Sequence, residues 1–168
     1  YDNNPDQNIP DHYEKICSTI KGETIKALGG HEDNDFDSWQ PNAIVVNLGT
    51  NDEEAFYSPM WKDEITGRTH KQRLNEDGTF NIEDLKNFEN AVSNFLRKLR
   101  KYNPGAHIVW AYGMLGSGMM PAIERAVESY KNQTGDGNVS VLLLPDTTEE
   151  TIGARMHPGI LSHRNAAD

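Results

Sequence analysis

The sequence is 168 residues long, which suits one domain with a sizeable hydrophobic core. Its formal net charge of −10 argues against nucleic acid or an anionic membrane surface as a partner. The single cysteine, Cys17, excludes an internal disulfide, and no apolar run approaches the roughly 20 residues of a membrane span.

The N-terminal part of the chain shows weak patterns. Residues 1–11 are polar, contain two prolines and predict an extended loop. Loosely spaced apolar residues predict a helix over residues 11–28, which Gly29-Gly30 ends. An acidic loop follows, and we expect Phe36 and Trp39 to pack beneath it as apolar anchors.

The segment Ala43–Leu48 is a nearly continuous apolar run, rich in β-branched residues. This pattern predicts a strand buried on both faces, as in a parallel sheet. The run ends in Gly49-Thr50-Asn51-Asp52, where the side chains become polar. Ligands of open α/β sheets bind beyond the carboxyl ends of the strands, so we expect Asn51 and Asp52 to lie at a functional site.

Residues 53–80 contain many charges and no clear periodicity, and they predict a long loop. Such loops inside compact domains are usually functional or mobile, and this one is expected to form one wall of the site. Its aromatic residues, Phe56, Tyr57 and Trp61, could stack on a ligand, but anchoring of the loop to the body is favoured.

The C-terminal half alternates helices and strands. Apolar residues at steps of three and four predict an amphipathic helix over Ile82–Tyr102. Apolar runs predict strands at His107–Tyr112 and Val139–Leu144 with a helix between them, and a short helix is expected from Pro158. This order predicts right-handed parallel crossovers and therefore an α/β fold.

Two further segments reach the same edge of the predicted sheet. The loop Gly113–Gly118 offers Met114 and Ser117 as candidate substrate contacts, although a loop serine is more often a turn former. His157 precedes Pro158, which holds its backbone extended. An imidazole can take up and return a proton near neutral pH, so His157 is the candidate general base; a packing or capping role is the alternative.

Gly49-Thr50-Asn51-Asp52 resembles the G-x-N-D block of the SGNH (GDSL-type) hydrolases, and His157-Pro158 resembles their last block. The wider sequence, including Trp39-Gln40-Pro41 and His163, is most similar to the branch of this family that contains the family two carbohydrate esterases and acetyl xylan esterases. The resemblance implies a flavodoxin-like, three-layer α/β/α sandwich with a parallel sheet. It also implies an acetylated oligosaccharide or polysaccharide as substrate, without metal or other cofactor.

The resemblance assigns roles to individual residues. His157 would serve as base and then acid, and Asn51 would donate to the oxyanion. Gly49 would permit the tight turn after the strand. Asp52 would fix this turn through backbone N–H groups. The candidate substrate contacts are Asp52, Trp61, Met114 and Ser117.

The family's nucleophile block, Gly-Asp-Ser, is absent from residues 1–168. Our interpretation is that these residues form a C-terminal portion of one SGNH domain without its first strand and helix. The nucleophilic Ser would lie on an upstream segment or on a separate chain. Many members orient the base with an Asp three residues before it, where this sequence has Ala154. A backbone carbonyl is the first choice to orient His157 instead, ahead of Asp146, Glu149 or Glu150.

The sequence is also compatible with three other classes of protein. One is a carbohydrate-binding module on the same fold, inactive because it lacks the nucleophile. Another is a structural half-domain that must associate with its N-terminal piece. A metal-dependent hydrolase ranks last, because the histidines show no metal-ligand spacing. The resemblance favours an extracellular protein, and the sequence itself leaves the compartment open.

Overall fold

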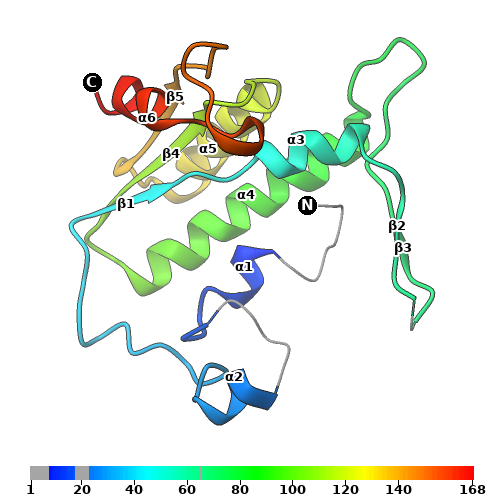
Figure 1. Ribbon diagram of the computed structural model, residues 1–168. Coiled ribbons are helices and arrows are strands. Elements are labelled where there is room, and N and C mark those ends of the chain that lie inside the picture. Colours follow the sequence, from blue (N-terminus) through cyan, green and yellow to red (C-terminus); the bar gives the residue numbers. More distant parts are fainter. Residues whose placement is uncertain (1–7, 18–22, 65) are drawn as a thin grey trace.

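The structure is a computed structural model that describes residues 8–17, 23–64 and 66–168. Its main sheet has three parallel strands in the order β1-β4-β5 (Figure 1). These strands are β1 (Ala43–Val46), β4 (His107–Gly113) and β5 (Val139–Leu144). The parallel pairing confirms the predicted α/β fold, and the bounds of the last two strands agree with the sequence pattern to within one residue.

Helix α4 (Ile82–Tyr102) precedes β4, and α5 (Met120–Thr134) joins β4 to β5. The bounds of α4 are those that the apolar spacing predicts. Its N-terminus is capped by Asn81, whose side chain accepts from the backbone N–H groups of Glu83 and Asp84. Such a cap satisfies amides that have no partner inside the helix.

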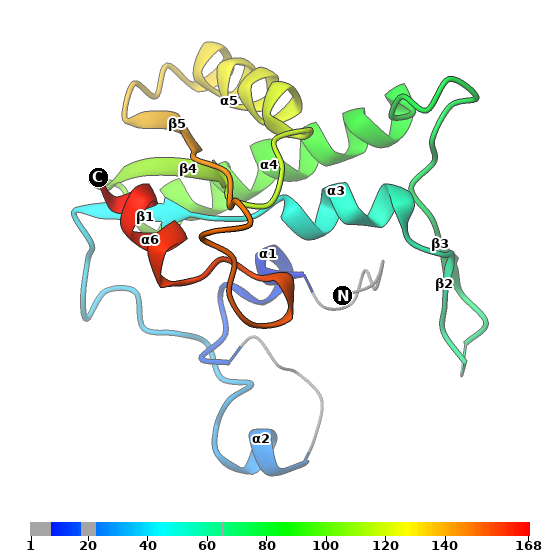
Figure 2. The same cartoon turned by 45° about the horizontal axis from the view of Figure 1, so that its top comes forward.

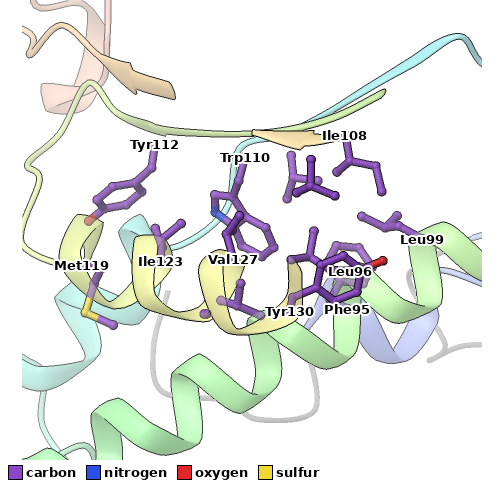
Figure 3. Packing of buried hydrophobic residues seen from close by; sticks show 14 of the residues in the cluster. Phe95, Leu96, Leu99, Ile108, Trp110, Tyr112, Met119, Ile123, Val127 and Tyr130 are labelled. Carbon is purple, nitrogen blue, oxygen red and sulfur yellow. The ribbon is translucent and has the colours of Figure 1, made fainter. Parts of the chain in front are cut away.

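Helices α4 and α5 lie side by side on one face of the sheet and form the core with it (Figure 3). Ile108, Trp110 and Tyr112 of β4 point toward these helices (Figure 3). The rings of Phe95 and Trp110 meet edge to face at 6.3 Å between centroids. Helix α6 (Ile160–Ala167) lies on the other side of the sheet (Figure 2).

That other face is only partly covered. The side chain of Val45 in β1 is 67% exposed, and Leu142 in β5 is 49% exposed. The prediction that the first strand is buried on both faces is therefore wrong for this structure. Successive side chains of a strand point to opposite faces, and it is the face toward α4 and α5 on which the buried core is built.

The predicted helix over residues 11–28 is also wrong. The chain instead forms two short helices, α1 (Ile9–His12) and α2 (Glu23–Ala27), with no buried side chain in either. Residues 18–22 of the predicted helix, and residues 1–7 of the predicted N-terminal loop, lie outside the described part. Of the two expected anchors, Phe36 stacks on Tyr102 at 4.5 Å, whereas Trp39 is 73% exposed.

Residues 53–80 are more ordered than a long loop. They begin within helix α3 (Thr50–Tyr57) and continue into a projecting hairpin, β2 (Trp61–Lys62) and β3 (Thr69–His70) (Figure 1). Phe56 stacks on Phe80 at 4.3 Å between ring centroids, which confirms that it anchors this segment to the body. No helix in the described residues is long and apolar enough to cross a bilayer.

Candidate active site

Three segments leave the sheet at the edge where its parallel strands end, here called the rim. They are α3 after β1, the loop 114–119 after β4 and residues 145–159 after β5. Hydrogen bonds join them in a row. The N–H of Gly118 donates to Glu53 of α3, the N–H of Gly116 donates to Oδ1 of Asp146 at 3.1 Å, and the N–H of Thr147 donates to the carbonyl of Met114 at 2.9 Å.

The first rim segment is the N-terminus of α3. Gly49 has a φ of 128°, and a Cβ there would come within 3.0 Å of the Tyr112 ring. Glycine is therefore required both by the backbone conformation and by the ring beneath it. Asn51 follows in the first turn and is exposed, so its side-chain amide is free to donate at the positive end of the helix dipole.

Asp52 does not make the loop-fixing contacts that we expected of it. Among the described residues its carboxylate makes no hydrogen bond to another residue, and desolvation raises its pKa. The next residue, Glu53, makes those contacts, since its carboxylate accepts from the hydroxyl of Tyr112 and from the N–H of Gly118.

The loop that carries His157 is closed at its base. Ile152 and Pro158 form an antiparallel bridge, and the N–H of Gly153 donates to the carbonyl of His157 at 2.7 Å. A Cβ on Gly153 would lie 2.9 Å from the Cα of Gly159, so the two strands of the loop approach each other more closely than side chains allow. This closure holds the backbone of His157 in place.

The imidazole of His157 is oriented by a backbone carbonyl. Its Nδ1 lies 2.8 Å from the carbonyl oxygen of Arg155. A carbonyl oxygen only accepts, so Nδ1 carries the hydrogen and Nε2 is left to accept a proton. The prediction of a carbonyl partner is confirmed, and Asp146, an alternative, instead accepts from Gly116.

The backbone conformation behind this contact is unusual. Arg155 has a φ of 54° and Met156 a φ of 63°, both in the left-handed region. Residues with side chains adopt it at a cost of about 1 kcal/mol or more. Two such residues in succession turn the carbonyl of Arg155 back toward the ring of His157.

The other three predicted substrate contacts lie in three different environments. Ser117 is exposed on the rim, where its carbonyl accepts from the N–H of Met120 at the start of α5. Met114 is buried and has a φ of 71°. Trp61 lies beyond the C-terminal end of α3, which is about 9 Å along the helix axis from Asn51, and the guanidinium of Arg68 lies over its ring.

The structure thus brings Asn51, Ser117 and His157 to one rim and leaves Trp61 outside it; their roles in catalysis stay predictions. Sequence reasoning missed Glu53 and Tyr112. The available signal was weak: an acid directly after the G-x-N-D block, and a tyrosine at the end of a buried strand. The described residues contain no cluster of three or more His, Cys, Asp or Glu side chains that could hold a metal ion.

No protein-family model matches the sequence, and no curated protein matches it either. A solved acetyl xylan esterase from the rumen bacterium Butyrivibrio proteoclasticus is 49% identical, with a TM-score of 0.91 over 95% of this chain and 43% of its own. The chain is similar to this acetyl xylan esterase and to family two carbohydrate esterases. Its mixed α/β fold with a parallel sheet is the SGNH-type fold of these enzymes.

Two more family two carbohydrate esterases share the fold. One, from Clostridium thermocellum and solved in complex with cellohexaose, is 25% identical, with a TM-score of 0.57 over 79% of this chain and 35% of its own. Another, from Cellvibrio japonicus, is 18% identical, with a TM-score of 0.63 over 97% of this chain and 38% of its own. The chain therefore spans less than half the length of each of these esterases.

Proposed function

We propose that residues 1–168 belong to a serine esterase that removes acetyl or other short acyl groups from carbohydrate. The observation that carries the proposal is the bond from His157 Nδ1 to the carbonyl of Arg155, which places the hydrogen of the neutral ring on Nδ1 and leaves the lone pair of Nε2 to act as a base. The similarity to an acetyl xylan esterase and to other family two carbohydrate esterases supports the substrate class.

In the proposed reaction, a serine oxygen bonds to the ester carbonyl carbon, and its proton passes to Nε2 of His157. Asn51 donates to the oxygen that becomes negative in the tetrahedral intermediate. His157 then returns the proton to the departing sugar hydroxyl as the carbon–oxygen bond breaks. Water attacks the acyl-enzyme by the same route, with His157 again as base, and acetate leaves.

The serine would come from a segment outside residues 1–168, which would make these residues the C-terminal portion of one SGNH domain. Support comes from the sheet itself. Strand β1 pairs only with β4 among the described residues, and Val45 exposes its side chain on the uncovered face. A parallel strand added beside β1 would end at the same rim as Asn51 and His157.

The test is fluorophosphonate labelling of the natural gene product, together with acetate release from acetylated xylan. We expect one labelled serine upstream of Tyr1. His157→Ala should lower kcat by about 10²-fold to 10⁴-fold, and Asn51→Ala by about 10²-fold to 10³-fold. The matched control is His163→Ala, because His163 is exposed on α6 beside the same loop.

A folded gene product that neither labels nor releases acetate would contradict the esterase. Binding of acetylated xylan by such a protein, measured by calorimetry, would instead support a non-catalytic carbohydrate-binding module. Acetate release that persists after His157→Ala, or labelling of a serine within these residues, would contradict the assignment of the base or the position of the nucleophile.

A further inference from the structure

Glu53 connects two of the three rim segments. It lies in the first turn of α3, two residues after Asn51, and its own N–H donates to the carbonyl of Gly49 at 2.9 Å. One oxygen of its carboxylate, Oε2, accepts both from the hydroxyl of Tyr112 and from the N–H of Gly118 at 3.0 Å. A single carboxylate therefore holds the end of β4 and the loop after it against α3.

Tyr112 supports this arrangement from below. Its ring is fully buried, and it contacts the position where Gly49 would carry a Cβ. Desolvation raises the pKa of its hydroxyl, and the hydrogen bond to Glu53 raises it further. The raised pKa keeps the proton on this hydroxyl at neutral pH, so the hydroxyl is the donor in its bond to Glu53.

The loop above Glu53 is shaped to fit the carboxylate. A Cβ on Gly118 would lie 2.6 Å from Oε1 of Glu53, and one on Gly116 would lie 3.4 Å from the same atom. Glycine at position 118 thus allows the loop to approach closely enough for its N–H to reach Oε2. An alanine there would push the carboxylate away.

We propose that Glu53 is a positioning residue for the esterase reaction, holding Asn51 and the loop 116–118 in a fixed relation at the rim. The inference rests on the proposed function, because it assigns Asn51 as the donor whose position matters. Donors that stabilise a developing negative charge must be held in place before the reaction, and a displacement of about 1 Å can cost a large factor in rate.

The test compares four variants of the full-length gene product in acetate release from acetylated xylan. Glu53→Ala removes the oxygen that accepts both hydrogen bonds, and we expect kcat to fall about tenfold or more while KM changes little. Glu53→Gln keeps an oxygen that can accept both bonds, so it should recover most of that loss. Gly118→Ala should lower kcat in the same way, because it displaces the carboxylate while leaving Glu53 itself unchanged. Glu54→Ala, an exposed neighbour on α3, is the matched control.

Hydrogen–deuterium exchange of the same variants separates positioning from general unfolding. Glu53→Ala should speed the exchange of peptides that cover residues 49–56 and 113–120 and leave α4 unchanged. Glu53→Ala with unchanged kcat would overturn the inference, and so would Glu53→Gln as damaging as Glu53→Ala. A folded wild-type protein without esterase activity would overturn the proposed function itself and the inference with it.

Discussion

The carbonyl oxygen of Arg155 lies 2.8 Å from Nδ1 of His157, in the place where a carboxylate would orient a catalytic histidine. This contact predicts the tautomer of the neutral imidazole, because a carbonyl accepts only from a protonated nitrogen. Nitrogen-15 NMR of the imidazole should show His157 as the Nδ1–H tautomer. A predominant Nε2–H form would contradict this geometry.

The tight closure of the His157 loop predicts that a methyl group added at Gly153 lowers the activity. Gly153→Ala would place a Cβ 2.9 Å from the Cα of Gly159, so the two sides of the loop must separate. We expect acetate release to fall at least about tenfold, since misplacement of a catalytic group is costly. Gly137→Ala is the control, because nothing lies within 4 Å of a Cβ there. Equal activity of the two variants would contradict the prediction.

Lys71 caps the C-terminal end of α3. Its Nζ donates to the carbonyls of Phe56 at 2.8 Å and of Ser58 at 2.5 Å, which the helix leaves without internal partners. Lys71→Met should lower the free energy of unfolding by about 1–2 kcal/mol, as expected for lost hydrogen bonds to a charged donor. Urea unfolding measures the change, with Lys86→Met on the exposed side of α4 as control. A difference below about 0.5 kcal/mol would exclude a stabilising role.

The lowered pKa of Asp136 predicts that the free energy of unfolding depends on pH. Burial acts to raise its pKa, but hydrogen bonds from Arg100, the N–H of Asn138 and the hydroxyl of Tyr130 outweigh burial and lower it. A carboxylate with a lowered pKa in the folded state stabilises the protein above its pKa in the unfolded state. This contribution is lost as the pH falls through the lowered folded value.

Asp136→Asn should therefore lower the free energy of unfolding by about 1–2 kcal/mol at neutral pH, where the pair with Arg100 is intact. The difference from wild type should shrink as the pH is lowered toward about 3, because protonation removes the charge from the wild-type side chain as well. Urea unfolding at several pH values measures both effects. A constant difference across the series would show that the charge contributes nothing.

The fold could be predicted where one physical signal dominates. Helix α4 carries a regular apolar stripe and a capping asparagine, so the pattern gave both of its ends. Helix α3 was missed because its first turn is polar and acidic, and only Ala55 and Phe56 are buried. The prediction of one N-terminal helix failed because the contacts there hold short segments, as in the bridge between Lys15 and Asp33.

Some residues of the candidate site could likewise be predicted from the sequence and others could not. His157 and Asn51 could be proposed because each stands in a local motif. The carbonyl partner of His157 was expected because Ala154 stands where many members of the family have an Asp. Glu53 could not be found, because its partners Tyr112 and Gly118 lie far away along the chain. Such contacts exist only once β4 has paired beside β1.

The order of the rim segments along the chain also determines when a working site can form during synthesis. Chains leave the ribosome from the N-terminus, and Asn51 emerges long before His157. A nascent chain can therefore hold its oxyanion donor while it still lacks its base. Under the proposed mechanism, esterase activity arises only after β5 has joined the sheet and the His157 loop has closed, so activity itself reports that folding is complete.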